Sequence, residues 1–392
     1  MTTHAVSFVN ARLGSATRTS LRWSGARITA VGAPPAPGDI VIDAAGDRLL
    51  PGLINAHDHL QLNNFPRLKF RERHENVGEW IADIDARRAV EPGIADNTAI
   101  PREARLRLGG IKNILSGVTT VAHHDPLYPS LLDGNFPCRV LADYGWSHSL
   151  ALDGAEKVRA SCLRTPAQQP WFIHAGEGVD SAALAEFAQL ERLDCLRGNS
   201  LFIHGVAFTA AERERLAAWG AGLIWCPSSN LFLLGRTADC ADLIARGRVA
   251  LGSDSRLSGT GDLLTELGVA RDCIDMPEAW LEALVTSIAA SLLRLSDLGR
   301  LRAGAMADCV VLPEAAPLGV ARRADLRCVV LDGRMRYGDA DYAERLMSAD
   351  DRIPVIVDGR DKILHRSLVD VLRSSPLQEP GVRLSEARGR AA

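Results

Sequence analysis

The sequence predicts an α/β fold: a (β/α)8 TIM-type barrel with a small β-sandwich formed by both ends of the chain. From about residue 49 to residue 295, short apolar or β-branched runs alternate with helical stretches, the pattern of βα units around a parallel sheet. Histidine or aspartate residues end several of these runs. At both ends of the chain, by contrast, the runs are short and are separated by Gly, Ser and Pro turns.

Seven strands are expected in the barrel, at residues 49–57, 118–123, 139–144, 171–174, 200–204, 222–226 and 249–253. Helices are expected between them, including 181–193, 209–219 and 238–246. Only residues 147–152, before a helix at 155–163, remain for an eighth strand. We therefore expect the barrel to be irregular around its fourth strand.

Both chain ends are expected to build one accessory β domain. Strand-like pieces occupy residues 5–11, 21–23, 27–31 and 39–42, and residues 308–312 and 326–332 have the same character. The predicted domains are a composite β-sandwich from 1–50 and 300–345, a barrel from 51–299, and a C-terminal tail from 346–392. The tail is charged and shows no clear core face, so we expect it to pack on a neighbouring subunit or to be partly mobile.

Composition excludes several classes of partner. The formal net charge is −3 in 392 residues, with 24% charged and 47% hydrophobic residues, so no basic field attracts nucleic acid. No run reaches the roughly 18 apolar residues that a membrane helix needs, and no signal peptide is evident at the N-terminus. The eight cysteines form no Cys-x-x-Cys pair. We expect a soluble, cytoplasmic protein without a nucleic-acid or membrane partner.

His57 and His59 are the first candidate metal ligands. Residues two apart in a strand share a face, so both imidazoles can bind one ion while Asp58 points elsewhere. An isolated His-x-His pair is equally compatible with two core histidines. His174 and His204 end two further runs, however, and Asp254 follows a third. Such a convergent set favours a metal site, where an open position lowers the pKa of a bound water to about 7.

Five short motifs carry a resemblance to a known family. They are Pro51-Gly52-Leu53-Ile54-Asn55-Ala56-His57-Asp58-His59, His174-Ala175-Gly176-Glu177, His204-Gly205, Cys226-Pro227-Ser228-Ser229-Asn230 and Gly252-Ser253-Asp254. Over about residues 5–335 the chain resembles the amidohydrolase superfamily, specifically its cytosine-deaminase-like, chlorohydrolase-type branch of mononuclear metal hydrolases. The resemblance implies that His57, His59, His174 and Asp254 hold the metal. It also implies that His204 polarises the substrate or orients the water.

Glu177 matches the proton-shuttling glutamate of the family. Gly176 allows the backbone to leave the strand after His174, so the carboxylate can fold back toward the metal site. The alternative is a solvated loop acid. Binuclear branches carry a carboxylated lysine on strand four, where this chain has none, so we expect one divalent ion. Zinc is preferred, and iron and manganese remain possible because the ligand types suit all three.

Substrate contacts are less constrained by the sequence. Arg256 is two residues past Asp254, where a guanidinium can grip a carboxylate. Of the adjacent His123 and His124, at most one should face the pocket. Trp80 can stack on a flat ring or belong to the core. The basic loop at 61–88 can receive an anionic group or form a solvated charge run.

These observations leave three functions to separate. The first is hydrolytic deamination of an amino-substituted heterocycle, with metal, Glu177, His204 and Asp254 as the catalytic groups. The second uses the same site for cyclic amide hydrolysis, or for removal of chloride or an alkylamine from a ring carbon. The third is a catalytically inactive binding barrel, against which the complete ligand set argues. A homodimer is expected from the family and from the general frequency of dimers.

Overall fold

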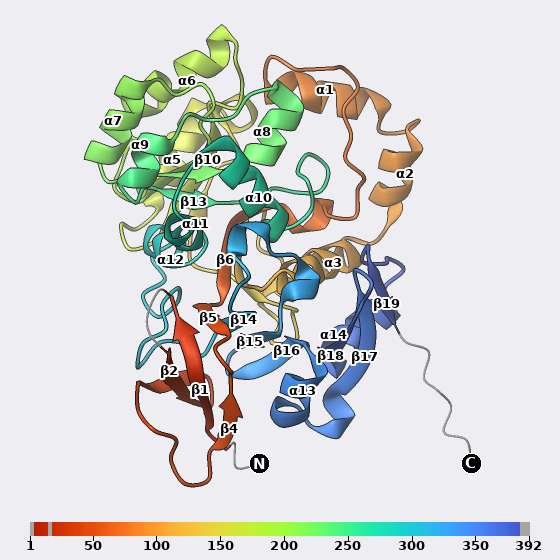
Figure 1. The fold of residues 1–392 in the computed structure, drawn as a ribbon. Helices are drawn as coiled ribbons and strands as arrows, with labels where there is room; N and C mark the ends of the chain where they lie inside the picture. The colour runs from red at the N-terminus through yellow and green to blue at the C-terminus, as the bar shows by residue number, and fades with distance from the viewer. Residues whose placement is uncertain (1–3, 15–17, 385–392) are drawn as a thin grey trace.

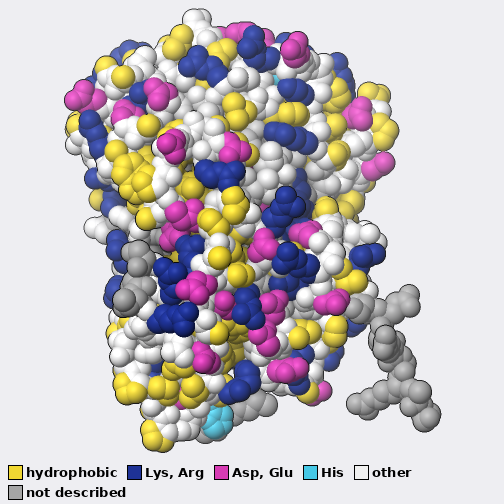
Figure 2. Space-filling model, viewed as in Figure 1, with side chains coloured by type: hydrophobic (Ala, Val, Ile, Leu, Met, Phe, Trp, Pro, Cys, Tyr) yellow, Lys and Arg dark blue, Asp and Glu magenta, His cyan; other side chains and the backbone are white. Residues whose placement is uncertain are grey.

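The computed structural model describes residues 4–14 and 18–384. Figure 1 shows helices and parallel strands in the upper half of the molecule, and strands from both chain ends side by side in the lower half. On the face drawn in Figure 2, basic and acidic side chains are interspersed without a field of one sign. None of the described helices is long and apolar enough to cross a bilayer.

Eight parallel strands form two hydrogen-bonded sheets, in the orders β6-β7-β8 and β13-β12-β11-β10-β9. The strands are β6 Leu53–Asp58, β7 Val118–His123, β8 Arg139–Val140, β9 Gly145–Trp146, β10 Trp171–Ala175, β11 Ser200–His204, β12 Gly222–Trp225 and β13 Val249–Leu251. The N–H of Asp254 donates to the carbonyl of His57 at 3.1 Å, so the carboxyl ends of β13 and β6 are adjacent. Within the described residues, no ladder joins the two sheets into a closed barrel.

Three predicted strand positions are wrong in detail. The run at 49–57 divides: β5 (Arg48–Pro51) joins the other sheet, and the barrel-type strand begins at Leu53. Gly52 marks the division, since a Cβ there would lie 2.3 Å from the Thr119 hydroxyl. The strand at 139–144 shortens to β8, and the eighth strand is β9 rather than 147–152. Ser149 instead caps a short helix, α4 (Leu150–Asp153), by accepting from the Leu152 N–H.

Helices connect and cover these strands. They are α1 Val77–Arg87, α2 Pro92–Ala99, α3 Arg102–Leu115, α5 Ala155–Arg164, α6 Ser181–Arg192, α7 Ala210–Ala218, α8 Pro227–Leu234, α9 Ala241–Ala245, α10 Leu263–Cys273, α11 Glu278–Leu284 and α12 Ser287–Leu292. Those predicted at 181–193 and 209–219 form almost as expected. Thr209 caps α7 in a reciprocal capping box with Glu212, which satisfies two otherwise unpaired donors.

The lower half of the molecule is an 11-stranded sheet with strands from both chain ends. Its amino-terminal strands are β1 Val6–Leu13, β2 Arg18–Ser24, β3 Arg27–Val31, β4 Ile40–Asp43 and β5. Its carboxyl-terminal strands are β14 Cys309–Leu312, β15 Cys328–Leu331, β16 Arg334–Gly338, β17 Arg352–Val357, β18 Arg360–His365 and β19 Val382–Leu384. β5 joins the two halves by pairing with β1 and β14. The domain boundaries at 50, 299 and 345 stay a prediction.

The expectation of a C-terminal tail without a core face is wrong for residues 352–384. β17, β18 and β19 extend the sheet, and helix α14 (Arg366–Ser374) packs on it. Val355, Leu364 and Leu368 are each at most 1% exposed. The apolar strand residues of this core lie on either side of a turn at 358–359. They do not follow a helical spacing, so the sequence alone did not reveal the core. The last eight residues of the expected tail lie outside the described residues.

A buried polar network ties β6 to α3 and β13. Asp58, which faces away from His57 and His59, is fully buried and lies 2.8 Å from Nζ of the equally buried Lys112. The amides of Asn113 and Asn63 also donate to its carboxylate, each at 2.8 Å. Lys112 Nζ donates to Asn63 at 2.8 Å as well and to Ser253, beside Asp254, at 3.2 Å. A charge this deep is tolerated because it is paired and hydrogen-bonded on every side.

Replacing Lys112 with Met should leave the Asp58 carboxylate buried without its cation. We expect the free energy of unfolding to fall by about 3–5 kcal/mol, measured by urea denaturation. The double variant Lys112→Met/Asp58→Asn should recover part of this loss, because it removes the unpaired charge. Asp194→Asn, which breaks the exposed pair with Arg159, should change stability by less than about 1 kcal/mol. Equal losses in the two single variants would contradict the assignment.

Candidate metal centre and active site

Four histidines and one aspartate meet at the carboxyl ends of four parallel strands. His57 and His59 lie at the end of β6, His174 in β10, His204 at the end of β11 and Asp254 after β13, and all five are buried. Nε2 of His57 is 3.4 Å from Nε2 of His174. Oδ1 of Asp254 is 3.9 Å from Nε2 of both His57 and His59.

Two overlapping groups of possible metal ligands share His57. His124 and His174 complete one group, and His204 and Asp254 complete the other. These groups bring together three of the four nominated ligands, and the fourth, His59, lies beside them with its Nε2 3.9 Å from Oδ1 of Asp254. The first group also adds His124, whose ring stacks 4.3 Å from that of His174.

Hydrogen bonds orient two of these imidazoles. Nδ1 of His59 is 2.9 Å from the Asp125 carboxylate, and Nδ1 of His174 is 2.8 Å from the carbonyl oxygen of His148. Because carboxylate and carbonyl oxygens only accept, both Nδ1 atoms carry the proton in these bonds. The Nε2 lone pairs then face the centre when the rings are neutral, the arrangement typical of metal-binding histidines.

Two serine hydroxyls hold one oxygen of the Asp254 carboxylate. Its Oδ2 accepts from the hydroxyls of Ser229 at 2.7 Å and Ser258 at 3.0 Å. Burial alone would raise its pKa, but the positive field of His59 and His204 and these hydroxyls hold the pKa below its usual value. Asp254 and His204 also adopt left-handed φ values of 52° and 76°. Such conformations cost about 1–3 kcal/mol each and cluster at functional sites.

Burial determines the protonation of the imidazoles. It lowers the pKa of His57 and His174 well below the usual value, with help from neighbouring histidines, so both rings are neutral and can donate a lone pair. At His59 burial acts in the same direction, but the Asp125 carboxylate outweighs it and raises the pKa to about 9. Asp125 thus stabilises positive charge at this point of the centre.

Glu177 faces the same centre from the loop after β10. Its Oε1 is 3.4 Å from Nε2 of His204, and only 8% of the residue is exposed, so the alternative of a solvated loop acid does not describe it. Burial, reinforced by Asp254 and Glu186, raises its pKa well above the usual value. Gly176, at φ 63°, makes the turn, and a Cβ there would lie 2.8 Å from the Phe208 ring.

A cavity of about 320 Å³ opens above these groups. His59, His174, Glu177, His204 and Asp254 line its floor. Its walls are mostly apolar and come from the segment after β6, from α1 and α2, and from the loop after β13: Leu62, Phe65, Trp80, Ile81, Ile84, Ile94 and Leu257. The polar floor and aromatic walls suit a flat, partly polar small molecule.

The substrate-contact predictions had mixed outcomes. Trp80 lines the cavity, and its indole N–H donates to the carbonyl of Leu68 at 2.9 Å. Arg256 does not line it, because its guanidinium pairs with the buried Glu379 at 2.6 Å, which corrects its nomination as a substrate ligand. Neither His123 nor His124 lines the cavity. His124 lies against His174, whereas His123 accepts from the N–H of Leu60.

The basic segment at 61–88 is not one long loop, and of its basic residues Arg88 alone lines the cavity, where it pairs with Asp85. Its second part forms α1, and its bases tie it to neighbouring elements. Arg67 donates to the carbonyls of Ser228 and Ser258, and Lys69 donates to that of Phe232. Arg71 pairs with Asp83. These contacts fix the segment over the cavity.

Sequence reasoning missed three residues that hold the site. They are Asp125, His148 and Asn230, whose Oδ1 lies 2.8 Å from Nδ1 of His204. Asp125 directly follows the His123-His124 pair at the end of a predicted strand, and this position could have identified it as a candidate site residue. Asn230 belongs to one of the motifs that carry the family resemblance, which gave it no role of its own, and it lies in helix α8. His148 contributes its backbone carbonyl rather than its side chain, so no sequence motif could have identified this role.

A model of the amidohydrolase family matches residues 143–336. A 5-methylthioadenosine/S-adenosylhomocysteine deaminase of Halobacterium salinarum is 27% identical over 343 residues, covering 74% of this chain and 78% of that protein. A hydroxydechloroatrazine ethylaminohydrolase of Pseudomonas sp. is 32% identical over 186 residues, which are 45% of this chain and 36% of that protein. A zinc-bound adenosine deaminase from Xanthomonas campestris shares the fold with a TM-score of 0.68 at 17% identity, covering 85% of this chain and 92% of that one.

The chain belongs to the amidohydrolase superfamily. This amidohydrolase is an enzyme of the hydrolase class, so the expectation of a catalytic rather than an inactive barrel is confirmed. Two structural neighbours, the adenosine deaminase and an atrazine chlorohydrolase from Arthrobacter aurescens, are zinc-bound, and the described residues of this chain contain a buried His and Asp cluster.

Asp125→Asn should weaken metal binding by about 10–100-fold, because the hydrogen-bond partner that orients His59 loses its charge. The dissociation constant of zinc, measured by competition with a chromophoric chelator, tests this expectation. Asp272→Asn removes an exposed carboxylate far from the ligands in sequence and should leave the constant unchanged. An unaltered zinc affinity in Asp125→Asn would show that this contact does not support the centre.

Proposed function

We propose that this amidohydrolase removes an amino group by hydrolysis from a heterocycle, with one divalent ion held by His57, His59, His174 and Asp254. The observation that carries the proposal is the position of Glu177 and His204 beside this donor set, at the floor of a cavity with aromatic walls. Relatives named as deaminases support the reaction class.

The donor set fits such an ion. Ligand atoms around a tetrahedral zinc with bonds of about 2.1 Å lie about 3.4 Å apart, close to the observed 3.4 Å and 3.9 Å separations. Imidazole nitrogens and one carboxylate suit zinc, and His59 would bind after giving up the proton on its Nε2; iron and manganese accept the same types of ligand. A divalent ion in this position would supply Lewis acidity and lower the pKa of a water to about 7.

The chain's own residues would then manage the protons. Glu177, buried and with a raised pKa, can take a proton from the attacking water and pass it to the leaving nitrogen. His204, oriented by Asn230, can donate through Nε2 when protonated, to a ring nitrogen that gains charge. Phe65, Trp80 and Leu257 exclude water and hold the ring against the floor.

The same machinery permits a different leaving group. Relatives of this chain include one named as an ethylaminohydrolase, and chlorohydrolases share the fold. We therefore keep removal of an alkylamine or chloride, and cyclic amide hydrolysis, as the alternative reactions. Ammonia among the products separates the first reaction from these.

We also propose the finer features of the molecule. The two parallel sheets represent one (β/α)8 barrel that is interrupted between β8 and β9, and the large sheet forms the composite sandwich. Zinc is the preferred metal, and the protein acts as a homodimer in the cytoplasm. Light scattering of the purified protein and metal analysis test the oligomeric state and the metal.

Glu177→Gln should reduce kcat by about 10²–10⁴-fold, because the amide cannot shuttle a proton. The assay is ammonia release by metal-quantified protein over aminopurines, aminopyrimidines, pterins and triazines. Metal content should not change, since Glu177 is not in the proposed ligand set.

Glu191→Gln on α6 is the matched control, because Glu191 is a surface residue paired with Arg215. This variant should keep full turnover. Undiminished ammonia release by Glu177→Gln would reject the role given to Glu177. Release of chloride or alkylamine without ammonia from the metallated wild type would instead favour the alternative reactions.

A further inference from the structure

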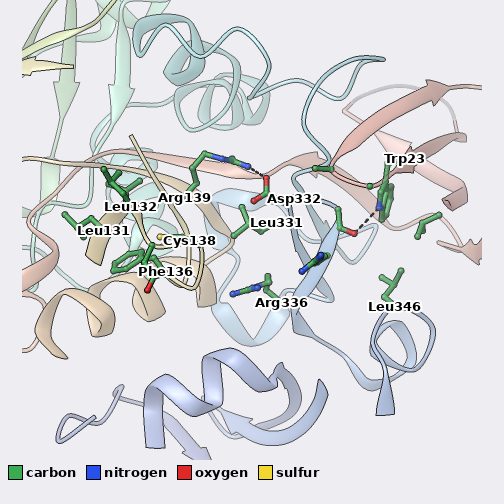
Figure 3. Close-up of a pocket in the computed structure, with 18 of the residues that line it drawn as sticks. Trp23, Leu131, Leu132, Phe136, Cys138, Arg139, Leu331, Asp332, Arg336 and Leu346 are labelled. Atoms are coloured by element: carbon green, nitrogen blue, oxygen red, sulfur yellow. Dashed lines mark hydrogen bonds and ion pairs between the residues drawn. The ribbon is translucent and has the colours of Figure 1, made fainter. Parts of the chain in front are cut away.

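A second and larger cavity lies where strands from the amino-terminal end of the chain, the stretch before β8 and the β15–β16 hairpin meet. Its volume is about 660 Å³, and we call it the hairpin cavity because the β15–β16 hairpin forms one side. Figure 3 shows its residues. Three further segments contribute to it: β1, β2 and β4 with the turn after β2, the stretch that leads into β8, and the end of α13 (Ala340–Leu346).

The hairpin cavity is separate from the metal centre. The metal centre lies at the carboxyl ends of the parallel strands, whereas residues 131–139 precede or begin β8 and so lie at its amino end. None of the residues that line the catalytic cavity lines the hairpin cavity. The proposed reaction leaves this second cavity unexplained.

Two walls of the hairpin cavity are apolar. Leu131 and Phe136 on one side are 2% and 3% exposed, and Trp23 on the other is 2% exposed. Leu132 lines the cavity and remains 56% exposed. The Trp23 indole N–H already donates to the carbonyl of Gly333 at 3.2 Å, and its ring stacks on Phe8 with the centroids 5.3 Å apart, so Trp23 contributes a fixed apolar edge of the wall. These surfaces suit an apolar or aromatic body.

Arg336 supplies a cationic group without a partner. No ion pair or side-chain hydrogen bond reaches its guanidinium within the described part of the chain, and its Nε is buried and unsatisfied. In Figure 3 its side chain extends from β16 toward Phe136 and Cys138. A buried donor without a partner is costly, and such a group points to a ligand that supplies the acceptor.

A local irregularity in the backbone of β16 determines where Arg336 lies. Val330 pairs with Met335 and Val329 with Tyr337, so Arg336 is the extra residue of a β-bulge. Bulges re-aim side chains and occur near functional sites. The hairpin turn is rigid, because Asp332 and Gly333 both have positive φ, 52° and 73°, and a Cβ on Gly333 would lie 1.9 Å from the carbonyl oxygen of Gly25.

The acidic residues of the hairpin cavity do not neutralise this group. Asp332 pairs with Arg139, which also holds Asp308 at 2.5 Å, and Asp133 is 3.4 Å from Arg107. Arg334, on the same strand, has no ion pair within the described residues either. The cavity therefore combines two uncommitted guanidinium groups with apolar walls.

We propose that the hairpin cavity is a non-catalytic binding site for a small organic anion, a carboxylate or phosphate joined to an aromatic or branched apolar body. Arg336 forms charge-assisted hydrogen bonds with the anionic group, and Arg334 adds long-range attraction. The apolar body packs against the wall formed by Leu131, Leu132 and Phe136. The volume lies in the range of small-molecule sites.

Isothermal titration of the metal-loaded protein with phenyl phosphate, benzoate and inorganic phosphate tests this site. We expect saturable binding of at least one aromatic anion, about tenfold or more tighter than that of inorganic phosphate. Arg336→Met should weaken it by about tenfold or more, and Arg334→Met by less. Arg246→Met, an exposed arginine that is absent from the cavity, should leave it unchanged.

His174→Ala separates this binding from binding at the metal centre. It disrupts the proposed ligand set and should leave phenyl phosphate binding intact if the anion occupies the hairpin cavity. Loss of binding in His174→Ala, no saturable binding of either aromatic anion, equal affinity for inorganic phosphate, or an unchanged constant in Arg336→Met would each overturn the proposal. Because the readout is binding, failure of the proposed reaction would not affect this result.

Discussion

The catalytic geometry depends on the buried ion pair between Asp58 and Lys112. Strand alternation sends Asp58 to the side of β6 opposite His57 and His59, into an interior where an unpaired carboxylate would not be tolerated. Lys112 from α3 neutralises it, and asparagine amides satisfy its remaining acceptor capacity. The network also reaches Ser253, so it fixes the ends of β6 and β13 together. The positions of both histidines and of Asp254 follow from this one arrangement.

Hydrogen bonds from surrounding residues orient the imidazoles of the centre and so define which nitrogen atoms face it. The acceptors come from different elements: Asp125 follows β7, the carbonyl of His148 follows β9, and Asn230 lies on α8. Each selects the tautomer that leaves Nε2 facing the centre. The left-handed backbone of His204 and Asp254 shows that conformational strain is accepted at the same place. Burial lowers the pKa of His57 and His174 and raises the pKa of Glu177.

The carboxyl-terminal segment contributes to the environment of the site without entering it. The buried Glu379 accepts from both Arg256 and Arg323, so the guanidinium nearest in sequence to Asp254 is used to bind the tail. This contact links the loop after β13 to the large sheet. The walls of the catalytic cavity therefore come mainly from the apolar segment after β6 and from helices α1 and α2. The hairpin cavity, at the opposite end of the parallel strands, leaves room for a ligand that does not compete with the substrate.

The sequence by itself determined the α/β class, most strands, and the ligand candidates with Glu177, because strand alternation and strand-end chemistry are local. It misplaced the strand at β9, hid the core of residues 352–384 and suggested a free Arg256, since each depends on partners distant in the chain. Only the tertiary structure decided which imidazole nitrogen faces the centre, which of His123 and His124 lies beside it, and where Arg336 points. Long-range hydrogen bonds and packing fix these features, and no local pattern encodes them.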